Sequence, residues 1–325
     1  MRKIVSVLII ALLLVSCKDD KSKNKRILFD SEGRINDVSV VIDNENWKGR
    51  LGEAIRELLT VPVYGLPQDE PTFDLNQIPP QVFTDFITRR RTVLKIEMGK
   101  PGGIAIRDNV YAKPQKVILI TGKTKQEIED VLEENAAKII ETFKNIELKE
   151  RQRLIRKSLF NSKEVSDKLG LKIEFPSAYR IAKEDDNFFW IRRDINTGTL
   201  NLLLFELPED AIKKDSVVNQ IVAIRDSIGK QYIEGPVEGS YMTTEMAYTP
   251  FHGETILDNK PTLETKGMWD VKNAFMAGPY INYAIEDKIN KRWIIAEGFA
   301  FAPSVEKRDY MFELEAIIKS IKIDE

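Results

Sequence analysis

Hydrophobic and polar positions alternate along this chain with two periods, and one almost entirely apolar run follows neither of them. The run spans residues 4–15, is apolar except for Ser6, and follows the basic residues Arg2 and Lys3. It is shorter than the about 20 residues that a helix needs to cross a ~30 Å hydrocarbon layer. A short basic segment before an apolar run of about 7–15 residues is typical of a secretory signal. We therefore expect a signal peptide over residues 1–16.

The pattern next predicts an N-terminal α/β half over residues 27–160. Apolar residues at helical spacing predict one helix over 45–59 and a second, longer helix that begins after Thr124. Thr124 and Glu127 fit a capping box at the start of the second helix. We expect this helix to continue, after a break, through 150–160. Short apolar runs predict strands at 38–43, 92–99, 103–112 and 115–122.

A second α/β half is predicted over residues 161–325. Three strands are expected within 169–208, with a hairpin turn at 196–198 between the last two. One amphipathic helix is expected over 215–233, and another closes the chain over 306–321. Further apolar runs predict strands at 268–278, 280–287 and 291–303.

Two long segments lack either period. Residues 62–80 contain five prolines, which do not permit long regular structure. We interpret this segment as an ordered connection. Residues 235–266 are polar and show no long periodic run, so we expect a second irregular connection there.

Together these elements predict an α+β fold. It consists of two α/β halves, each an antiparallel or mixed sheet packed with helices, behind the signal peptide and a flexible tether over residues 17–26. Apolar residues make up 42% of the chain and charged residues 31%, an ordinary globular balance. The formal charge of −2 gives no reason to expect a nucleic-acid partner. The chain has one cysteine and therefore no internal disulfide.

That cysteine follows the signal peptide directly. The quartet Leu14-Val15-Ser16-Cys17 resembles a bacterial lipobox. The resemblance implies cleavage before Cys17, a diacylglyceryl group on its sulfur and an acyl group, such as palmitate, on its new amine. Two or three acyl chains make membrane attachment effectively permanent, whereas one chain binds reversibly. The alternative is a free thiol beside an ordinary cleavage site.

The next three residues carry a second resemblance. Lys18-Asp19-Asp20 is similar to the Lys-acidic-acidic signal that sends some Bacteroidota lipoproteins to the outer face of the outer membrane. It implies a surface-exposed, lipid-anchored protein, which we favour over an orientation facing the periplasm. The alternative is a charged tether without a sorting role.

The body of the chain resembles a known but uncharacterised family. The segments "FPSAYRIAKEDDNFFWIRRD" at 175–194 and "KRWIIAEGFAFAP" at 291–303, with the lipobox and the proline-rich segment, resemble Bacteroidota outer-membrane lipoproteins defined by a domain of unknown function. The resemblance implies no catalytic residues. The C-terminal half is also similar in element order to the PsbP-like α/β/α sandwich, which implies a binding or assembly role.

Candidate catalytic chemistry is sparse. With one His and one Cys, the sequence offers no Cys/His zinc site, and we expect no metal and no cofactor. We interpret His252 as an exposed loop residue, because no Gly-x-Ser-x-Gly elbow accompanies it. The alternative is an envelope hydrolase that uses His252 or paired carboxylates within 235–266.

Aromatic residues on the predicted strands offer a candidate ligand surface. We interpret them as the core of a sheet covered by helices on both faces, with a groove for a glycan or peptide as the alternative. The candidate residues are Trp190, Trp269, Tyr280 and Trp293.

The sequence thus predicts a membrane-anchored envelope lipoprotein that acts as a non-catalytic binding or assembly module. The expected partners are the membrane, through the lipid anchor, and an envelope protein or a glycan or peptide ligand.

The anchor can be tested at its attachment point. A Cys17→Ala variant should leave the membrane fraction and lose incorporated labelled fatty acid, because the acylated sulfur and amine are gone. The measurement is detergent partitioning with metabolic labelling. A variant that still partitions into detergent and labels like the parent would show that Cys17 is not the anchor.

Overall fold

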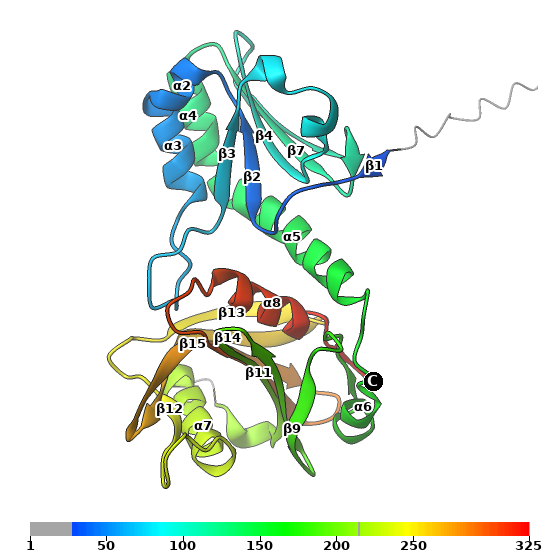
Figure 1. Ribbon diagram of the computed structural model, residues 1–325, viewed down its shortest axis with the longest axis vertical. Coiled ribbons are helices and arrows are strands. Elements are labelled where there is room, and N and C mark those ends of the chain that lie inside the picture. The colour runs from blue at the N-terminus through cyan, green and yellow to red at the C-terminus, as the bar shows by residue number, and fades with distance from the viewer. Residues whose placement is uncertain (1–27, 214, 325) are drawn as a thin grey trace, which may run out of the picture.

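The computed structural model describes residues 28–213 and 215–324, and within them the chain has the predicted α+β fold (Figure 1). Two large sheets carry most of the structure, a five-stranded one in the N-terminal half and an eight-stranded one in the C-terminal half. The sorting residues Lys18, Asp19 and Asp20, and Cys17 itself, lie outside the described residues.

The N-terminal sheet is mixed, with strand order β3-β2-β4-β7-β5. β2 pairs in parallel with β3 and β4, and β4 with β7, whereas β5 runs antiparallel to β7. Its central strands β2, β4 and β7 are mostly apolar and buried, whereas the edge strands β3 and β5 carry polar, partly exposed residues. The bounds are β2 Asp37–Val41, β3 Asp74–Ile78, β4 Thr92–Met98, β5 Gly103–Asp108 and β7 Lys116–Gly122.

Helices cover one face of this sheet (Figure 1). Val38, Leu94 and Ile118 point toward them and form one core cluster with side chains of the helices. On the opposite face, Val41 and Val93 pack under the connection that contains the short helices η1 and η2. The bounds are α2 Asn44–Lys48, α3 Arg50–Leu59, α4 Lys125–Glu134, α5 Ala136–Ile155, η1 Pro80–Val82 and η2 Asp85–Arg89.

Thr124 caps the helix as predicted, although the Glu127 carboxylate binds the N–H one residue before the N-cap, and the helix break was predicted in the wrong place. The Glu127 N–H donates to Thr124 Oγ1 at 3.1 Å, and the Glu127 carboxylate accepts from the Lys123 N–H. The break falls at Asn135, and α5 then runs uninterrupted to Ile155. The polar positions near its C-terminal end remain helical because Glu147 faces inward and binds Arg91, with Arg91 Nε 2.7 Å from Glu147 Oε1.

The C-terminal sheet is antiparallel throughout, with order β12-β14-β15-β16-β11-β10-β9 and β13 paired to β14. Helix α7 (Val217–Tyr232) packs on one face and α8 (Arg308–Ile318) on the other. The predicted hairpin at 196–198 is present between β10 and β11. The strand bounds are β9 Arg180–Asp185, β10 Phe188–Ile195, β11 Gly198–Pro208, β12 Tyr241–Thr244, β13 Phe251–Leu257, β14 Lys260–Lys272, β15 Ala274–Asp287 and β16 Arg292–Phe301.

Small elements complete the two halves. Strand β1 (Phe29–Asp30) pairs in parallel with β6 (Ala112–Lys113). Helix α6 (Lys163–Leu169) is followed by β8 (Leu171–Lys172), which pairs with the last strand β17 (Lys322–Ile323). Another short helix, η3 (Glu209–Ala211), follows β11.

Two predictions about irregular or single segments were wrong. Residues 235–266 contain β12, β13 and the first half of β14, because partly exposed strands at the sheet edge carry polar residues on both faces. Residues 268–278 form a hairpin, since Asn273 adopts a positive φ of 67° and reverses the chain. The proline-rich segment contains one short strand, β3, where no proline interrupts residues 74–78, and no long helix or strand.

The proline-rich segment also joins the two halves. The carboxylate of Glu70, which is 3% exposed, accepts the backbone N–H groups of Lys307 at 2.8 Å and Arg308 at 2.6 Å. These N–H groups begin α8. The Arg308 guanidinium in turn donates to Asp74 at 3.1 and 2.8 Å. Helix α8 is therefore capped by a residue of the N-terminal half while it packs on the C-terminal sheet.

Candidate functional site

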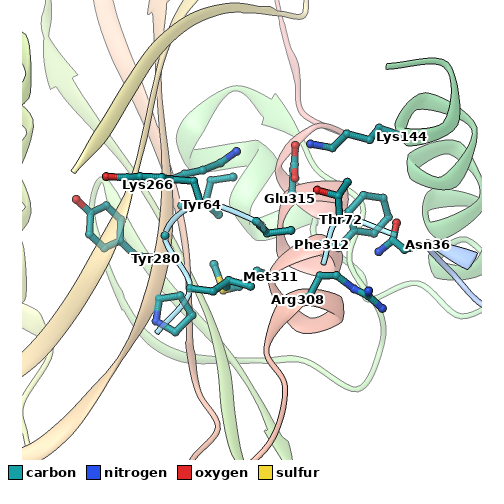
Figure 2. A pocket seen from close by; sticks show the side chains of 15 residues that line it. Asn36, Tyr64, Thr72, Lys144, Lys266, Tyr280, Arg308, Met311, Phe312 and Glu315 are labelled. Carbon is teal, nitrogen blue, oxygen red and sulfur yellow. The ribbon is translucent and has the colours of Figure 1, made fainter. Parts of the chain in front are cut away.

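A cavity of about 50 Å³ lies where the two halves meet. Its walls come from the proline-rich segment, α5, β14, β15 and α8 (Figure 2). The volume suits a few water molecules or one small polar group. Six apolar residues contribute to the lining, namely Val63, Leu66, Pro279, Ile281, Met311 and Phe312.

Charged side chains converge on this cavity from distant parts of the sequence. Lys144 points from α5 toward Glu315 on α8, and Lys266 reaches in from β14 on the other side (Figure 2). Glu315 Oε1 lies 2.6 Å from Lys319 Nζ, and Lys266 Nζ lies 2.9 Å from Glu264 Oε1. The cavity therefore combines apolar walls with a few convergent polar groups, which is the usual composition of a ligand site.

A buried tyrosine links the two carboxylates. The Tyr283 hydroxyl donates to Glu264 Oε1 at 2.7 Å and lies 3.4 Å from Glu315 Oε1. Burial, followed by the charges of Glu315 and Glu264, raises the pKa of Tyr283 well above its ordinary value. The phenol therefore stays protonated and keeps its role as a donor.

The ionisation of Glu315 depends on its neighbours. Burial opposes its charge, but the ammonium groups of Lys319, Lys266 and Lys144 outweigh burial and lower the pKa of Glu315 to about 2. Burial likewise opposes the charge of Lys266, and the carboxylates of Glu315 and Glu264 nevertheless raise its pKa.

Lys144 differs from the other two lysines. Burial lowers the pKa of its ammonium group, and the nearby charges of Lys266 and Lys319 lower it further. The charge of Glu315 is the largest effect that opposes this lowering, although its carboxylate is bound to Lys319. Among the described residues, Lys144 makes no ion pair or hydrogen bond of its own. It is the ammonium group of this cluster that remains available to a ligand.

The four aromatic residues singled out from the sequence do not share one surface. Trp190 and Trp269 border a hollow of about 230 Å³ near the C-terminal end of α7. Trp293 borders a separate groove of about 820 Å³ near the N-terminal end of that helix. Tyr280 lines the junction cavity, and the Arg225 guanidinium lies 3.6 Å from the centre of its ring. Trp269, Tyr280 and Trp293 are almost completely buried in the core cluster beneath α7.

His252 lies on a strand and not in a loop, so its predicted setting was wrong. It belongs to the edge strand β13 and pairs with Thr265 of β14. Its Nδ1 is buried and has no hydrogen-bond partner within the described chain. Of the carboxylates in 235–266, Asp258 binds Lys322 and Glu264 binds Lys266.

Sequence reasoning missed the junction cluster. Lys144 lies beside the apolar stripe of α5, which contains Phe143 and Ile146, and its position resembles that of any lysine flanking such a stripe. No sequence spacing relates Lys144 to Lys266 or Glu315. Only the docking of α5 on α8 brings them together.

The described residues contain neither a candidate metal site nor a helix that could span a membrane. Residues 28–213 and 215–324 contain no group of three or more His, Cys, Asp and Glu side chains that could hold a metal ion. No helix in the same residues is long and apolar enough to cross a membrane.

Comparison with known proteins gives family matches without an activity. A family described as domain of unknown function DUF4837 matches residues 158–320, and domain of unknown function DUF8532 matches residues 31–156. No curated protein matches the chain.

Two solved structures show distant likeness. The Ran-binding protein Mog1p of Saccharomyces cerevisiae matches over 47% of this chain and 90% of that chain, with 6% identity and a TM-score of 0.32. Human StAR-related lipid transfer protein 5 matches over 53% of this chain and 97% of that chain, with 8% identity and a TM-score of 0.25. At these scores, neither likeness carries an argument about this chain.

The low pKa of Glu315 predicts a specific pH dependence of stability. Its folded pKa of about 2 lies below the ordinary 4.5, so its contribution is present above pH 4.5 and is lost as pH falls toward 2. Since the side chain is 13% exposed, the contribution is on the order of 3 kcal/mol. Urea unfolding should show Glu315→Gln destabilised by roughly this amount at pH 7 and by less than half of it at pH 3.

Glu133→Gln is the matched control, because Glu133 is exposed on α4. It should unfold like the parent at both pH values. An equal loss of stability in Glu315→Gln at pH 7 and pH 3 would contradict the assigned pKa.

Proposed function

The chain belongs to the family described as domain of unknown function DUF4837, and from that premise we propose that it is a lipid-anchored envelope protein that binds a ligand non-catalytically in the junction cavity. The ligand carries one anionic group beside an apolar body. The observation that carries this proposal is Lys144, an unpaired ammonium group at a largely apolar cavity.

The anchor and address rest on the N-terminal sequence. The Leu14-Val15-Ser16-Cys17 lipobox supports acylation of Cys17, and Lys18-Asp19-Asp20 supports the surface of a Bacteroidota outer membrane. The proposed organisation is a signal peptide over 1–16, a tether over 17–26, and domains over 27–160 and 161–325, the second PsbP-like. The family matches to 31–156 and 158–320 are compatible with this division.

Charge favours an anion. The cluster holds the ammonium groups of Lys144, Lys266 and Lys319 and the carboxylates of Glu264 and Glu315. The two carboxylates are already bound to Lys266 and Lys319. A single negative charge next to Lys144 would make the net charge of the cluster zero. It would also compensate the Lys144 ammonium group for the hydration that burial removes.

Size and polarity restrict the rest of the ligand. A cavity of about 50 Å³ accepts a carboxylate but not a whole ligand. Tyr64 lines the cavity and is half exposed, and its ring lies 5.4 Å from that of the exposed Phe251. These rings extend the apolar surface outward from the cavity, where they can cover the body of the ligand.

The lining does not provide the parts of a hydrolase. Its only aliphatic hydroxyl belongs to Thr72, whose Oγ1 donates to the Val61 carbonyl at 2.7 Å. His252 is not among the lining residues. The residues of this cavity therefore fit ligand binding better than they fit general base catalysis.

The proposal predicts an affinity that depends on Lys144. Dodecanoate serves as the probe, and dodecanamide as its uncharged counterpart. Because a charge-assisted hydrogen bond contributes about 1.5–3 kcal/mol, Lys144→Met should weaken dodecanoate binding by about tenfold or more. Binding of dodecanamide should change little. Isothermal titration calorimetry measures both affinities.

The control and the pH profile sharpen the test. Lys149→Met changes an exposed lysine of the same helix and should leave dodecanoate binding unchanged. In the parent, affinity should fall as pH rises through the Lys144 pKa, which lies below the ordinary 10.5. Lys144→Met should lose this dependence. Equal affinities of the parent for dodecanoate and dodecanamide would reject the anion site.

A further inference from the structure

Aromatic side chains are exposed at the end of the N-terminal half where the described chain begins. Phe29 of β1 is 62% exposed and Phe86 of η2 is 65% exposed. The Arg89 guanidinium lies 3.9 Å from the centre of the Phe29 ring. Phe86 and Arg89 are three residues apart in a 3₁₀ helix, which places them on the same side. Phe29, Arg89 and Phe86 therefore form one continuous surface, the β1–η2 surface.

Backbone hydrogen bonds hold the two parts of this surface together. The Ser31 N–H donates to the Lys113 carbonyl at 3.2 Å, and the Glu32 N–H donates to the Arg89 carbonyl at 2.9 Å. Phe29 and Phe86 are thus fixed relative to each other by the pairing of β1 with β6 and η2. They are exposed on a rigid support and not on a free end.

The charges near the β1–η2 surface are mixed and slightly basic. Arg34, Arg89, Arg90 and Lys113 lie beside β1, η2 and β6, and the neighbouring acids are Asp30, Glu32 and Asp85. Exposed phenylalanine rings next to arginine and lysine suit a membrane surface, because such rings are buried at the boundary of headgroups and acyl chains while the cations bind lipid phosphates.

Chain length brings this surface close to the proposed anchor. Eleven residue-to-residue steps lead from Cys17 to Leu28, where the described structure begins. At about 3.3–3.6 Å per residue, they span at most about 40 Å. If Cys17 holds acyl chains in a bilayer, β1 starts within that distance of the lipid surface. Tethering also raises the local concentration, so a weak contact becomes populated.

We propose that the β1–η2 surface lies on the lipid bilayer that holds Cys17, with Phe29 and Phe86 among the headgroups and Arg89 beside lipid phosphates. This inference rests on the proposed lipid anchor and adds the orientation of the protein on its membrane. The occupant is the bilayer itself, because the tether delivers this end of the molecule to it.

A reporter beside the surface tests the contact. The full-length acylated chain, with Thr84→Cys labelled by a fluorophore, is reconstituted into vesicles of phosphatidylethanolamine and phosphatidylglycerol that contain headgroup spin-labelled lipid. Thr84 is exposed and two residues from Phe86. Ile289→Cys is the matched control in the exposed turn before β16. Quenching at position 84 should exceed that at position 289 by at least twofold.

A second variant identifies the residues responsible. Combining Phe29→Ser with Phe86→Ser should abolish the excess quenching at position 84 while the chain stays on the vesicles. Its melting temperature should match that of the parent, since both rings are exposed. Equal quenching at both positions on vesicle-bound protein would overturn the membrane contact and leave the anchor intact. A chain that is absent from the vesicles would overturn both.

Discussion

The carboxylate of Glu70 at the start of α8 is the interaction on which the rest of the structure depends. Lys307, the N-cap residue of α8, makes no side-chain cap, so the first N–H groups of the helix rely on Glu70 from the other half. A buried carboxylate here satisfies N–H groups that would otherwise be orphaned and complements the helix dipole. Because α8 also packs on the eight-stranded sheet, this cap fixes the proline-rich segment of one half against the core of the other.

The junction cavity follows from that attachment. With α8 held in place, Glu315 faces α5, and Lys144 of α5 lies opposite it (Figure 2). Further contacts keep the two helices together, since Arg151 lies 3.4 Å from Glu313 and Gln152 donates to the Ala316 carbonyl at 3.1 Å. The low pKa of Glu315 and the lowered pKa of Lys144 are both consequences of this burial between the halves. The cavity and the Lys144 ammonium group beside it therefore depend on the packing of the two halves against each other.

The sequence predicts the regular parts of this fold better than its edges or its site. Periodic segments such as the β2 run and the capped helix after Thr124 match the structure, because one buried face imposes the pattern. Residues 235–266 were misread since β13 lies at an edge and exposes both Phe251 and Ile256. His252 was misplaced with them. The cluster of Lys144, Lys266 and Glu315 had no sequence signal, because its members meet only through tertiary packing. Lys144 and Lys266 are more than a hundred residues apart in the sequence.

Calorimetric unfolding tests most directly whether the two halves form one unit through Glu70. If they do, the parent chain should unfold in a single transition whose calorimetric and van't Hoff enthalpies agree, as in a two-state protein. Glu70→Gln, which keeps the size of the side chain but removes its charge, should separate this transition into two. Two transitions already present in the parent, or a single unchanged transition in Glu70→Gln, would contradict the account.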